Sequence, residues 1–144
     1  MDVYDAKILQ NLSENGKVTQ QELAERIGLS LSACQRRIKV LEENGAIQGY
    51  RAVIDPELLG EAFTVFVGIN LERHSRAEIQ AFQTAVIRLE GVKEVHHIAG
   101  QYDYLLKVKV ADIQAYENFH ADRLAGIKGI AQITSHITMS TFKS

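Results

Sequence analysis

The spacing of apolar residues divides the chain into two parts with different periods. Up to Gly45 the apolar residues recur every three or four positions, which predicts three helices over residues 2–15, 19–27 and 30–44. From Phe63 to Leu71 they occupy every second position, which predicts a half-buried strand. The first part is therefore expected to be a small helical domain, and the second to be built on a sheet.

The second and third predicted helices are joined by a short turn. Thr19 and Glu22 match the S/T-x-x-E capping box with which many helices begin. Gly28-Leu29-Ser30 then provides a glycine that ends one helix and a serine that caps the next. Two short helices around a tight glycine turn are typical of a helix-turn-helix.

The third predicted helix has two different faces. At about 100° per residue, Cys34, Ile38 and Leu41 fall on one stripe, which is predicted to be buried. The opposite face carries side chains that donate hydrogen bonds to base edges and phosphates: Ser32, Gln35, Arg36 and Lys39. An ordinary solvated helix face would have the same composition. Arg37 lies on the flank, where it is predicted to contact a phosphate or to pair with Glu42 or Glu43.

Residues 46–54 look extended, and Asp55-Pro56 stops them. The predicted division is a helix-turn-helix domain over residues 1–46, an extended strand and linker over 47–61, and a second domain over 62–144. The second domain continues with a helix over 76–90, strands over 92–99 and 102–110 joined by a hairpin turn at Gly100-Gln101, a helix that Asp112 caps, and a strand over 130–142.

This βαββαβ order has an internal repeat. Residues 79–82, Ile-Gln-Ala-Phe, recur as Ile-Gln-Ala-Tyr at 113–116, 34 positions later. Such a duplication is expected of a ferredoxin-like fold, which makes the chain an α+β protein. Helices on one face of an antiparallel sheet leave the other face open, and Phe66, Ile98 and Leu105 make that face partly apolar. A second copy of the chain is the expected cover, so homodimerisation is predicted.

Composition narrows the function classes. The chain is 46% apolar and 24% charged, and no apolar run is long enough to cross a membrane. The acidic start lacks a signal for export, and the one cysteine is predicted to be buried, so a cytoplasmic protein is expected. Residues 1–60 contain seven Lys/Arg and nine Asp/Glu. A local basic helix in an acidic domain favours a specific, salt-sensitive dimeric DNA-binding protein over a general DNA coat.

Nothing in the sequence favours a cofactor or a metal. His96 and His97 are adjacent on a strand and so point to opposite faces, and His120 lies on the apolar stripe of its predicted helix with Tyr116 and Leu124, as a core histidine would. Cys34 has no cysteine partner at metal-binding spacing, and no phosphate-binding glycine loop is present. No cofactor and no metal ion are therefore expected.

The ordered motifs of the chain resemble those of the Lrp/AsnC family of bacterial and archaeal transcription regulators, nearly from end to end. They are Asp5-x-x-Ile8-Leu9, Asn15-Gly16-Lys17, Glu22-Leu23-Ala24, Ile27-Gly28-Leu29-Ser30, Arg36-Arg37-Ile38-Lys39-x-Leu41-Glu42, Gly45-x-Ile47-x-Gly49-Tyr50, Asp55-Pro56 and Gly100-x-Tyr102-Asp103-Tyr104-Leu105-Leu106. The resemblance implies an N-terminal (winged) helix-turn-helix and a regulatory domain that dimerises through its sheet. It also implies further assembly, often into octamers, and an effector that is usually an amino acid.

The resemblance further implies effector binding near the Gly-x-Tyr-Asp-Tyr hairpin. It points to Gly100, Tyr102, Asp103 and Tyr104: the turn offers backbone N–H groups to a carboxylate, and Asp103 offers a partner for an α-amino group. The alternative is structural, with Gly100 making a turn, Asp103 bonding backbone and the tyrosines packing on the sheet. Thr134 and His136 project from one side of the last strand, where they either complete the pocket or face solvent.

The sequence therefore predicts a sequence-specific transcriptional regulator that binds double-stranded DNA and responds to a small molecule. Ser30, Ser32, Gln35, Arg36 and Lys39 are predicted to reach the major groove or its edge, and Arg37 and Arg51 to touch phosphates. Two alternatives remain. Some proteins that resemble this family in fold decarboxylate modified tetrapyrroles, and the acidic balance of residues 1–60 also fits a ligand-binding module without DNA contact.

Overall fold

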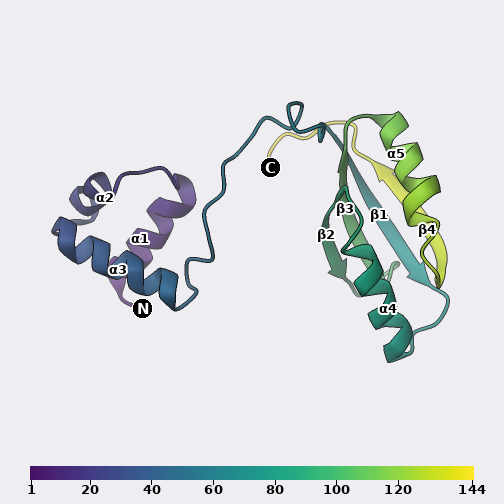
Figure 1. Cartoon of the computed structure of the whole chain (residues 1–144), viewed down its shortest axis with the longest axis horizontal. Helices are drawn as coiled ribbons and strands as arrows, with labels where there is room; N and C mark the ends of the chain where they lie inside the picture. Colours follow the sequence, from purple (N-terminus) through teal and green to yellow (C-terminus); the bar gives the residue numbers. More distant parts are fainter. The chain divides into compact units, whose positions relative to one another are not determined.

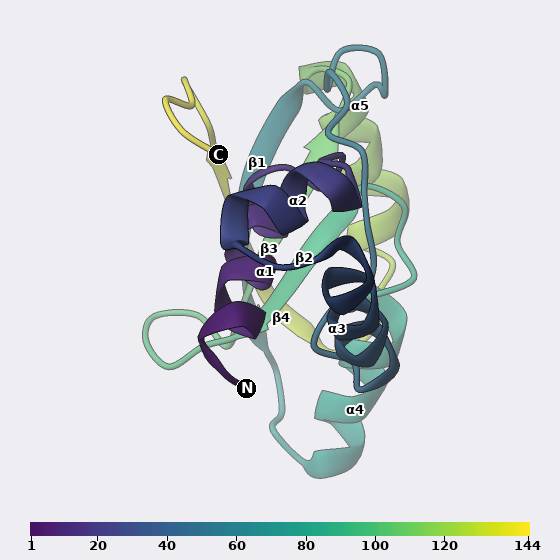
Figure 2. The ribbon, with the colours of Figure 1, turned by 90° about the vertical axis from the view of Figure 1, so that its left-hand side faces the viewer.

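Three short helices form the first of the two units into which the chain divides. The computed structural model describes residues 1–144, with units over Met1–Val53 and Ile54–Ser144. The helices of the first unit are α1 (Val3–Glu14), α2 (Gln20–Ile27) and α3 (Leu31–Glu43) (Figure 1). Figure 2 turns the same three helices toward the viewer. The domain division at residues 46 and 61 stays a prediction.

Local sequence starts and stops these helices as predicted. Thr19 and Glu22 form a reciprocal capping box at the start of α2, and the Ser30 Oγ accepts a hydrogen bond from the Ala33 N–H at the start of α3. Gly28 ends α2 with φ of 77°, a left-handed conformation that is strained for residues with a Cβ. The turn between α2 and α3 is thereby kept to a few residues.

The core of the first unit is built from one stripe of each helix. Cys34, Ile38 and Leu41 of α3 are buried, which confirms the predicted stripe. They pack with Ile8 of α1 and with the buried residues of α2, which are Leu23, Ala24 and Ile27. Burial against this cluster fixes which face of α3 remains in solvent.

No strand forms within the extended strand and linker predicted over residues 47–61, nor over residues 46–54, which look extended in sequence. Val53 and Ile54 are exposed. A strand needs a neighbour for its backbone N–H and C=O groups, and this chain offers none along the segment. The first unit therefore consists of helices, turns and an irregular segment over residues 48–53, without a strand.

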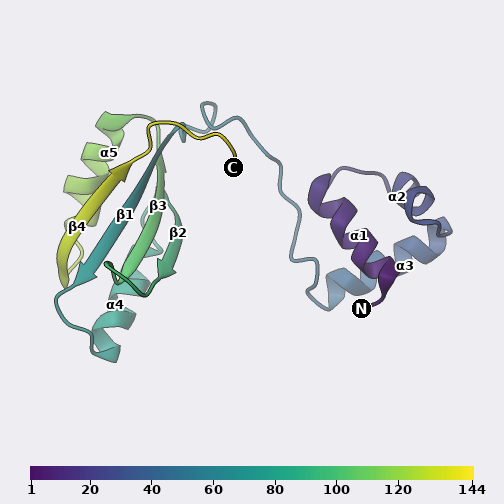
Figure 3. The ribbon, with the colours of Figure 1, turned by 180° about the vertical axis from the view of Figure 1, so that it is seen from behind.

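The second unit has the predicted βαββαβ order. Its strands form one antiparallel sheet in the order β2-β3-β1-β4, with α4 and α5 on one face (Figure 1). Figure 3 shows the sheet from the other side, which no helix covers. The elements are β1 (Phe63–Leu71), α4 (Arg76–Val86), β2 (Val92–His97), β3 (Tyr104–Val110), α5 (Ile113–Phe119), the π-helix η1 (His120–Leu124) and β4 (Ile130–Ile137).

Several element ends differ from prediction. β4 ends at Ile137, not at residue 142, because its ladder partner Val65 is near the start of β1. α4 ends at Val86, four residues earlier than predicted. The predicted two-residue hairpin at Gly100-Gln101 is instead a connection over residues 98–103, so Tyr102 lies outside β3.

The alternating residues of the strands separate the two faces of the sheet. Val65, Val67 and Ile69 of β1 are fully buried under the helices, as are Leu106 and Val108 of β3. The residues between them point to the open face, where Phe66 is 37% exposed. The strands thus present a packed apolar face to α4 and α5 and a mixed face to solvent.

Candidate nucleic-acid interface and effector site

The face of α3 opposite the buried stripe is in solvent. Ser32, Gln35, Arg36 and Lys39 are all exposed, as the helical spacing predicts. Gln35 and Arg36 make no side-chain hydrogen bond or ion pair, and Lys39 has only a 3.8 Å pair with the exposed Glu43. Their donors are therefore available to an external partner.

The other residues predicted to contact DNA are Ser30, Arg37 and Arg51, and they differ in whether their side chains already have partners within the chain. The Ser30 Oγ is already occupied as the cap of α3, at 3.2 Å from the Ala33 nitrogen. Arg51 is exposed in the segment that follows the helices. Arg37 pairs with neither Glu42 nor Glu43, so that prediction is wrong; its Nη1 lies 2.7 Å from Asp2 and 3.0 Å from Asp5.

On the open face of the sheet, Tyr102 folds back over β1. A Cβ built on Gly68 would lie 2.6 Å from the Tyr102 ring, so only glycine at this strand position allows such an approach. The Tyr102 hydroxyl lies 2.8 Å from the His136 Nε2, and the two rings meet edge to face. Thr134 is the β4 partner of Gly68. Three of the six predicted effector residues, Tyr102, Thr134 and His136, are therefore neighbours around Gly68.

Asp103 lies beside this group, at the end of β1. Its Oδ2 accepts a hydrogen bond from the Leu71 N–H at 2.8 Å and lies 2.8 Å from the His74 Nε2. The Leu71 N–H, and after it His74, hold the pKa of the Asp103 carboxyl below its usual value, so this group is ionised at neutral pH. The alternative interpretation of Asp103 was a bond to the backbone of the hairpin. The carboxylate does accept a hydrogen bond from backbone, but the donor belongs to β1.

Gly100 and Tyr104 lie apart from this group. Tyr104 is 1% exposed and belongs to the core under the helices, where its hydroxyl accepts a hydrogen bond from Gln83 at 2.8 Å and its ring stacks on His97. The prediction of Tyr104 as an effector contact is therefore corrected: its side chain points to the opposite face from Tyr102. Gly100 is exposed with φ of 145°, a conformation that favours glycine.

Sequence reasoning missed three residues of this site. Gly68 makes room for the Tyr102 ring, the Asn70 side chain accepts a hydrogen bond from the Asp103 N–H at 3.1 Å, and His74 pairs with the Asp103 carboxylate. A glycine inside an otherwise regular apolar strand was the one available signal, because it marks a close approach by another group. Neither Asn70 nor His74 carried such a signal in the sequence, since their partner Asp103 lies about thirty residues away.

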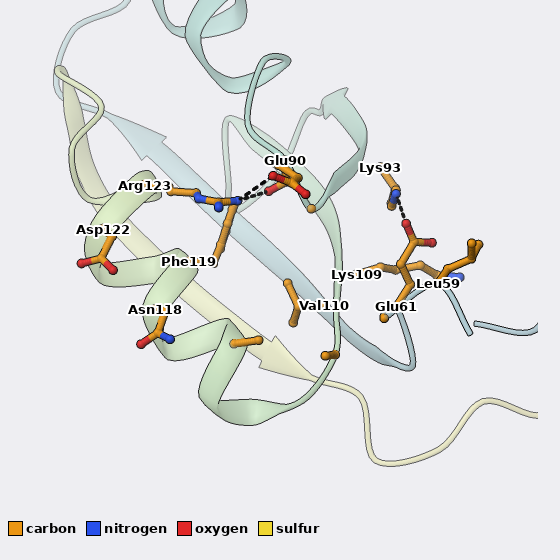
Figure 4. Close-up of a pocket in the computed structure, with 14 residues that line it drawn as sticks. Leu59, Glu61, Glu90, Lys93, Lys109, Val110, Asn118, Phe119, Asp122 and Arg123 are labelled. Atoms are coloured by element: carbon orange, nitrogen blue, oxygen red, sulfur yellow. Dashed lines mark hydrogen bonds and ion pairs between the residues drawn. The ribbon is translucent and has the colours of Figure 1, made fainter. Parts of the chain in front are cut away.

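A separate hollow of about 440 Å³ lies at the other end of the sheet, between the start of β2, the end of β3 and α5 (Figure 4). None of the six predicted effector residues line it. Its lining combines the apolar Val110 and Phe119 with two ion pairs, Lys93 with Glu61 and Arg123 with Glu90. Four of the six charged residues that line the hollow are thus paired within the chain, and the other two, Lys109 and Asp122, form no ion pair.

The described residues hold no cluster of histidine, cysteine or carboxylate side chains suited to a metal ion. His96 and His97 point to opposite faces of β2, since they pair with Leu105 and Tyr104 of β3 respectively. Cys34 is buried and its burial raises the pKa of the thiol. No helix has both the length and the apolar character that a membrane crossing requires.

Two protein-family models match the chain. One, described as winged helix-turn-helix DNA-binding, matches residues 1–48, and the other, described as the Lrp/AsnC ligand binding domain, matches residues 64–144. The first match contains α1, α2 and α3, and the second contains the whole sheet from Thr64 onward. Both surfaces described above therefore lie within regions that these families share.

Full-length relatives match as well. A proline dehydrogenase transcriptional activator of Rhizobium radiobacter is 36% identical over 99% of this chain and 92% of its own length. A leucine-responsive regulatory protein of Haemophilus influenzae is 37% identical over 99% of this chain and 86% of its own. The crystal structure of a Neisseria meningitidis transcriptional regulator in complex with L-Met has 33% identity and a TM-score of 0.93, covering 100% of this chain and 93% of that one.

Proposed function

This chain belongs to the Lrp/AsnC family of transcriptional regulators, and we propose that it reads a specific double-stranded DNA sequence through α3 under the control of an amino acid. The observation that carries this proposal is the exposed face of α3, where Gln35 and Arg36 have no partner within the chain. A helix that is buried on one side and carries unoccupied donors on the other fits the major groove.

Contacts within this interface are assigned by what each side chain offers. Arg36 and Gln35 present several donors in a plane and are proposed to contact base edges. Ser32 and Lys39 are proposed to contact bases or phosphates beside them, and Arg51 a phosphate. Ser30 contributes by capping α3, and its exposed position at the helix N-terminus also suits a phosphate.

The proposed effector is an amino acid bound near the open face. Support comes from the relatives, one of which is a leucine-responsive protein and another a complex with L-Met. The ionised Asp103 suits the α-amino group, and the hydroxyls of Tyr102 and Thr134, with His136, suit the carboxylate. The backbone at Gly100 offers further N–H groups. Tyr104 is left out because it is buried.

A homodimer is proposed from the open face of the sheet, further association from the family resemblance, and location from the proposed DNA target. Phe66 and Leu105 make the open face partly apolar, so a homodimer is proposed through this face, and dimers are proposed to associate further, up to an octamer. We place the protein in the cytoplasm because its proposed target is DNA. No catalytic role is proposed, since the matched relatives are named as regulators.

The test is a fluorescence-anisotropy titration of the DNA upstream of the chain's own coding region, across salt concentrations and with each amino acid. Tight binding that weakens with salt and shifts with one amino acid is the expected result. Tight binding that ignores every amino acid would refute the effector proposal alone. Absence of specific binding under every condition would refute the regulator proposal and favour the ligand-module or enzyme alternatives.

Arg36 provides the sharpest single variant. Arg36→Ala is expected to lower affinity for the specific fragment by about 1–3 kcal/mol while changing affinity for random DNA much less, because alanine cannot donate to a base edge. Lys7→Ala, which removes an exposed cation of α1, is the control and should change neither value much. An equal loss on both DNAs would make Arg36 a phosphate contact.

A further inference from the structure

Arg37 joins the recognition helix to the first turn of α1. Its Nη1 donates to the Asp2 Oδ2 at 2.7 Å and to the Asp5 Oδ1 at 3.0 Å. Its guanidinium carbon also lies 5.2 Å from the centre of the Tyr4 ring, within reach of a cation–π interaction. Every partner of Arg37 therefore comes from residues 2–5, although the sequence separation is more than thirty residues.

The two aspartates use their remaining oxygens to hold the start of α1. The Asp2 Oδ1 accepts from the Asp5 N–H at 2.9 Å, and the Asp5 Oδ2 accepts from the Asp2 N–H at 3.3 Å. Each carboxylate thus has one oxygen on the backbone of α1 and one on Arg37. This arrangement ties the end of one helix to a defined point on another.

The charge around Arg37 is unfavourable for a phosphate. One guanidinium faces two carboxylates, so the cluster carries a local excess of negative charge at neutral pH. Hydrogen bonding from the Asp5 N–H and from Arg37 lowers the pKa of Asp2, which keeps that carboxylate ionised. A DNA phosphate approaching this cluster would meet repulsion from the two acids, whereas Arg36, one position earlier, has no acidic partner.

We propose that Arg37 is a positioning residue, which sets the orientation of α3 against α1 for DNA reading and does not contact DNA itself. This inference rests on the proposed reading of DNA by α3. It replaces the sequence-based expectation of a phosphate contact. It also assigns a role to two of the acidic residues of the first unit: Asp2 and Asp5 bind Arg37 of the recognition helix.

Arg37→Gln and its neighbour Arg36→Gln form a matched pair for the test. Affinity for the upstream fragment and for random DNA is measured by anisotropy between about 50 and 200 mM salt, at a temperature where circular dichroism shows both variants folded. A variant that no longer binds one phosphate has a slope of log affinity against log salt that is smaller by about 0.9. Arg37→Gln is expected to lower specific affinity about three- to tenfold, since glutamine cannot form the two half-exposed ion pairs, with an unchanged slope and unchanged binding to random DNA.

The acidic partners supply a test of opposite sign. The double variant Asp2→Asn with Asp5→Asn removes two negative charges near DNA and keeps a residue that caps helices well. Loss of positioning predicts weaker specific binding, whereas simple electrostatics predicts tighter binding to every DNA. Arg37→Lys, which retains one of the two pairs, should restore part of the specific affinity.

Three results would overturn the inference: a smaller salt slope in Arg37→Gln, specific affinity equal to that of the parent chain, or tighter binding by the Asp2→Asn, Asp5→Asn variant. A variant that is only less stable would show a lower melting temperature with normal specific affinity when folded, which also contradicts positioning. If the parent chain itself binds no specific DNA, the proposed function fails first and this inference falls with it.

Discussion

Gly68 is the position at which one added methyl group should disturb the proposed effector site most directly. A Cβ there would lie 2.6 Å from the Cγ, Cδ1 and Cδ2 atoms of Tyr102, closer than real Cβ contacts come. These ring atoms are near the Tyr102 backbone, so the whole residue must move. Its hydroxyl would then leave His136, which lies 2.8 Å away. Gly68→Ala should therefore displace the 98–103 connection from the sheet.

The magnitude follows from two opposing terms. Overpacking costs about 1–3 kcal/mol of unfolding free energy. Alanine in place of a strand glycine otherwise stabilises by about 0.5–1 kcal/mol. Gly68→Ala is thus expected to destabilise the parent chain by about 1–2 kcal/mol, and to stabilise a Tyr102→Ala chain by about 0.5 kcal/mol, because the ring is absent there. The resulting coupling between the two positions is about 2 kcal/mol.

Urea unfolding of the four chains of this cycle, followed by circular dichroism at one protein concentration, measures the coupling. Gly49→Ala is the control, since no atom lies within 4 Å of its Cβ position and its backbone has no left-handed strain. The same anisotropy assay should show that Gly68→Ala retains DNA binding and loses its response to the amino acid. Equal effects of Gly68→Ala with and without the Tyr102 ring would refute the reasoning.

Three further outcomes follow from single groups. Cys34 is fully buried and burial raises the pKa of its thiol, so a thiol reagent at pH 8 should react only at the rate of unfolding; fast reaction in the native state would contradict this. Asp103 has a lowered folded pKa, so its stabilisation is complete above the unfolded value of about 3.9 and is lost as pH falls through the folded value. The urea midpoint of Asp103→Asn should accordingly approach that of the parent chain at pH 3, and a difference as large as at pH 7 would refute the assignment. Ser30→Ala should lower the unfolding free energy by about 1 kcal/mol, as measured by urea titration, through loss of the α3 cap, while Ser30→Asp should retain most of it.

Local sequence was enough for most of the fold. The start of α2 depends on Thr19 and Glu22, which are three residues apart, and the turn after it depends on the conformation of Gly28. The face of α3 follows from the period of its apolar residues, because burial of a stripe determines the opposite face as well. These features need no knowledge of distant segments, so the sequence predicts them.

Partners across the fold were beyond such reasoning. Helical spacing placed Arg37 on the flank of α3, but nothing local showed that α1 would bring Asp2 and Asp5 to it. Glu42 and Glu43, which are nearer in sequence, were predicted as ion-pair partners of Arg37, and that prediction is wrong. Residues 46–54 form no strand for a related reason: an extended segment becomes a strand only where another strand is available to pair with it.

Tyr102 and Tyr104 show why the surroundings of the candidate effector residues could be predicted only in part. The family resemblance grouped the two tyrosines as effector contacts. The predicted strand over residues 102–110 is consistent with that grouping, because residues two positions apart in a strand share a face. β3 begins only at Tyr104, and the Asp103 N–H donates to the Ile69 carbonyl at the point where the chain enters the sheet. Tyr102 therefore lies on the open face and Tyr104 in the core. If the proposed amino-acid response exists, a change at Tyr104 would alter it through the packing of α4 on the sheet, because the Tyr104 side chain is buried there and bonds Gln83 of α4. Of the two tyrosines, Tyr102 alone lies on the face where the amino acid is proposed to bind.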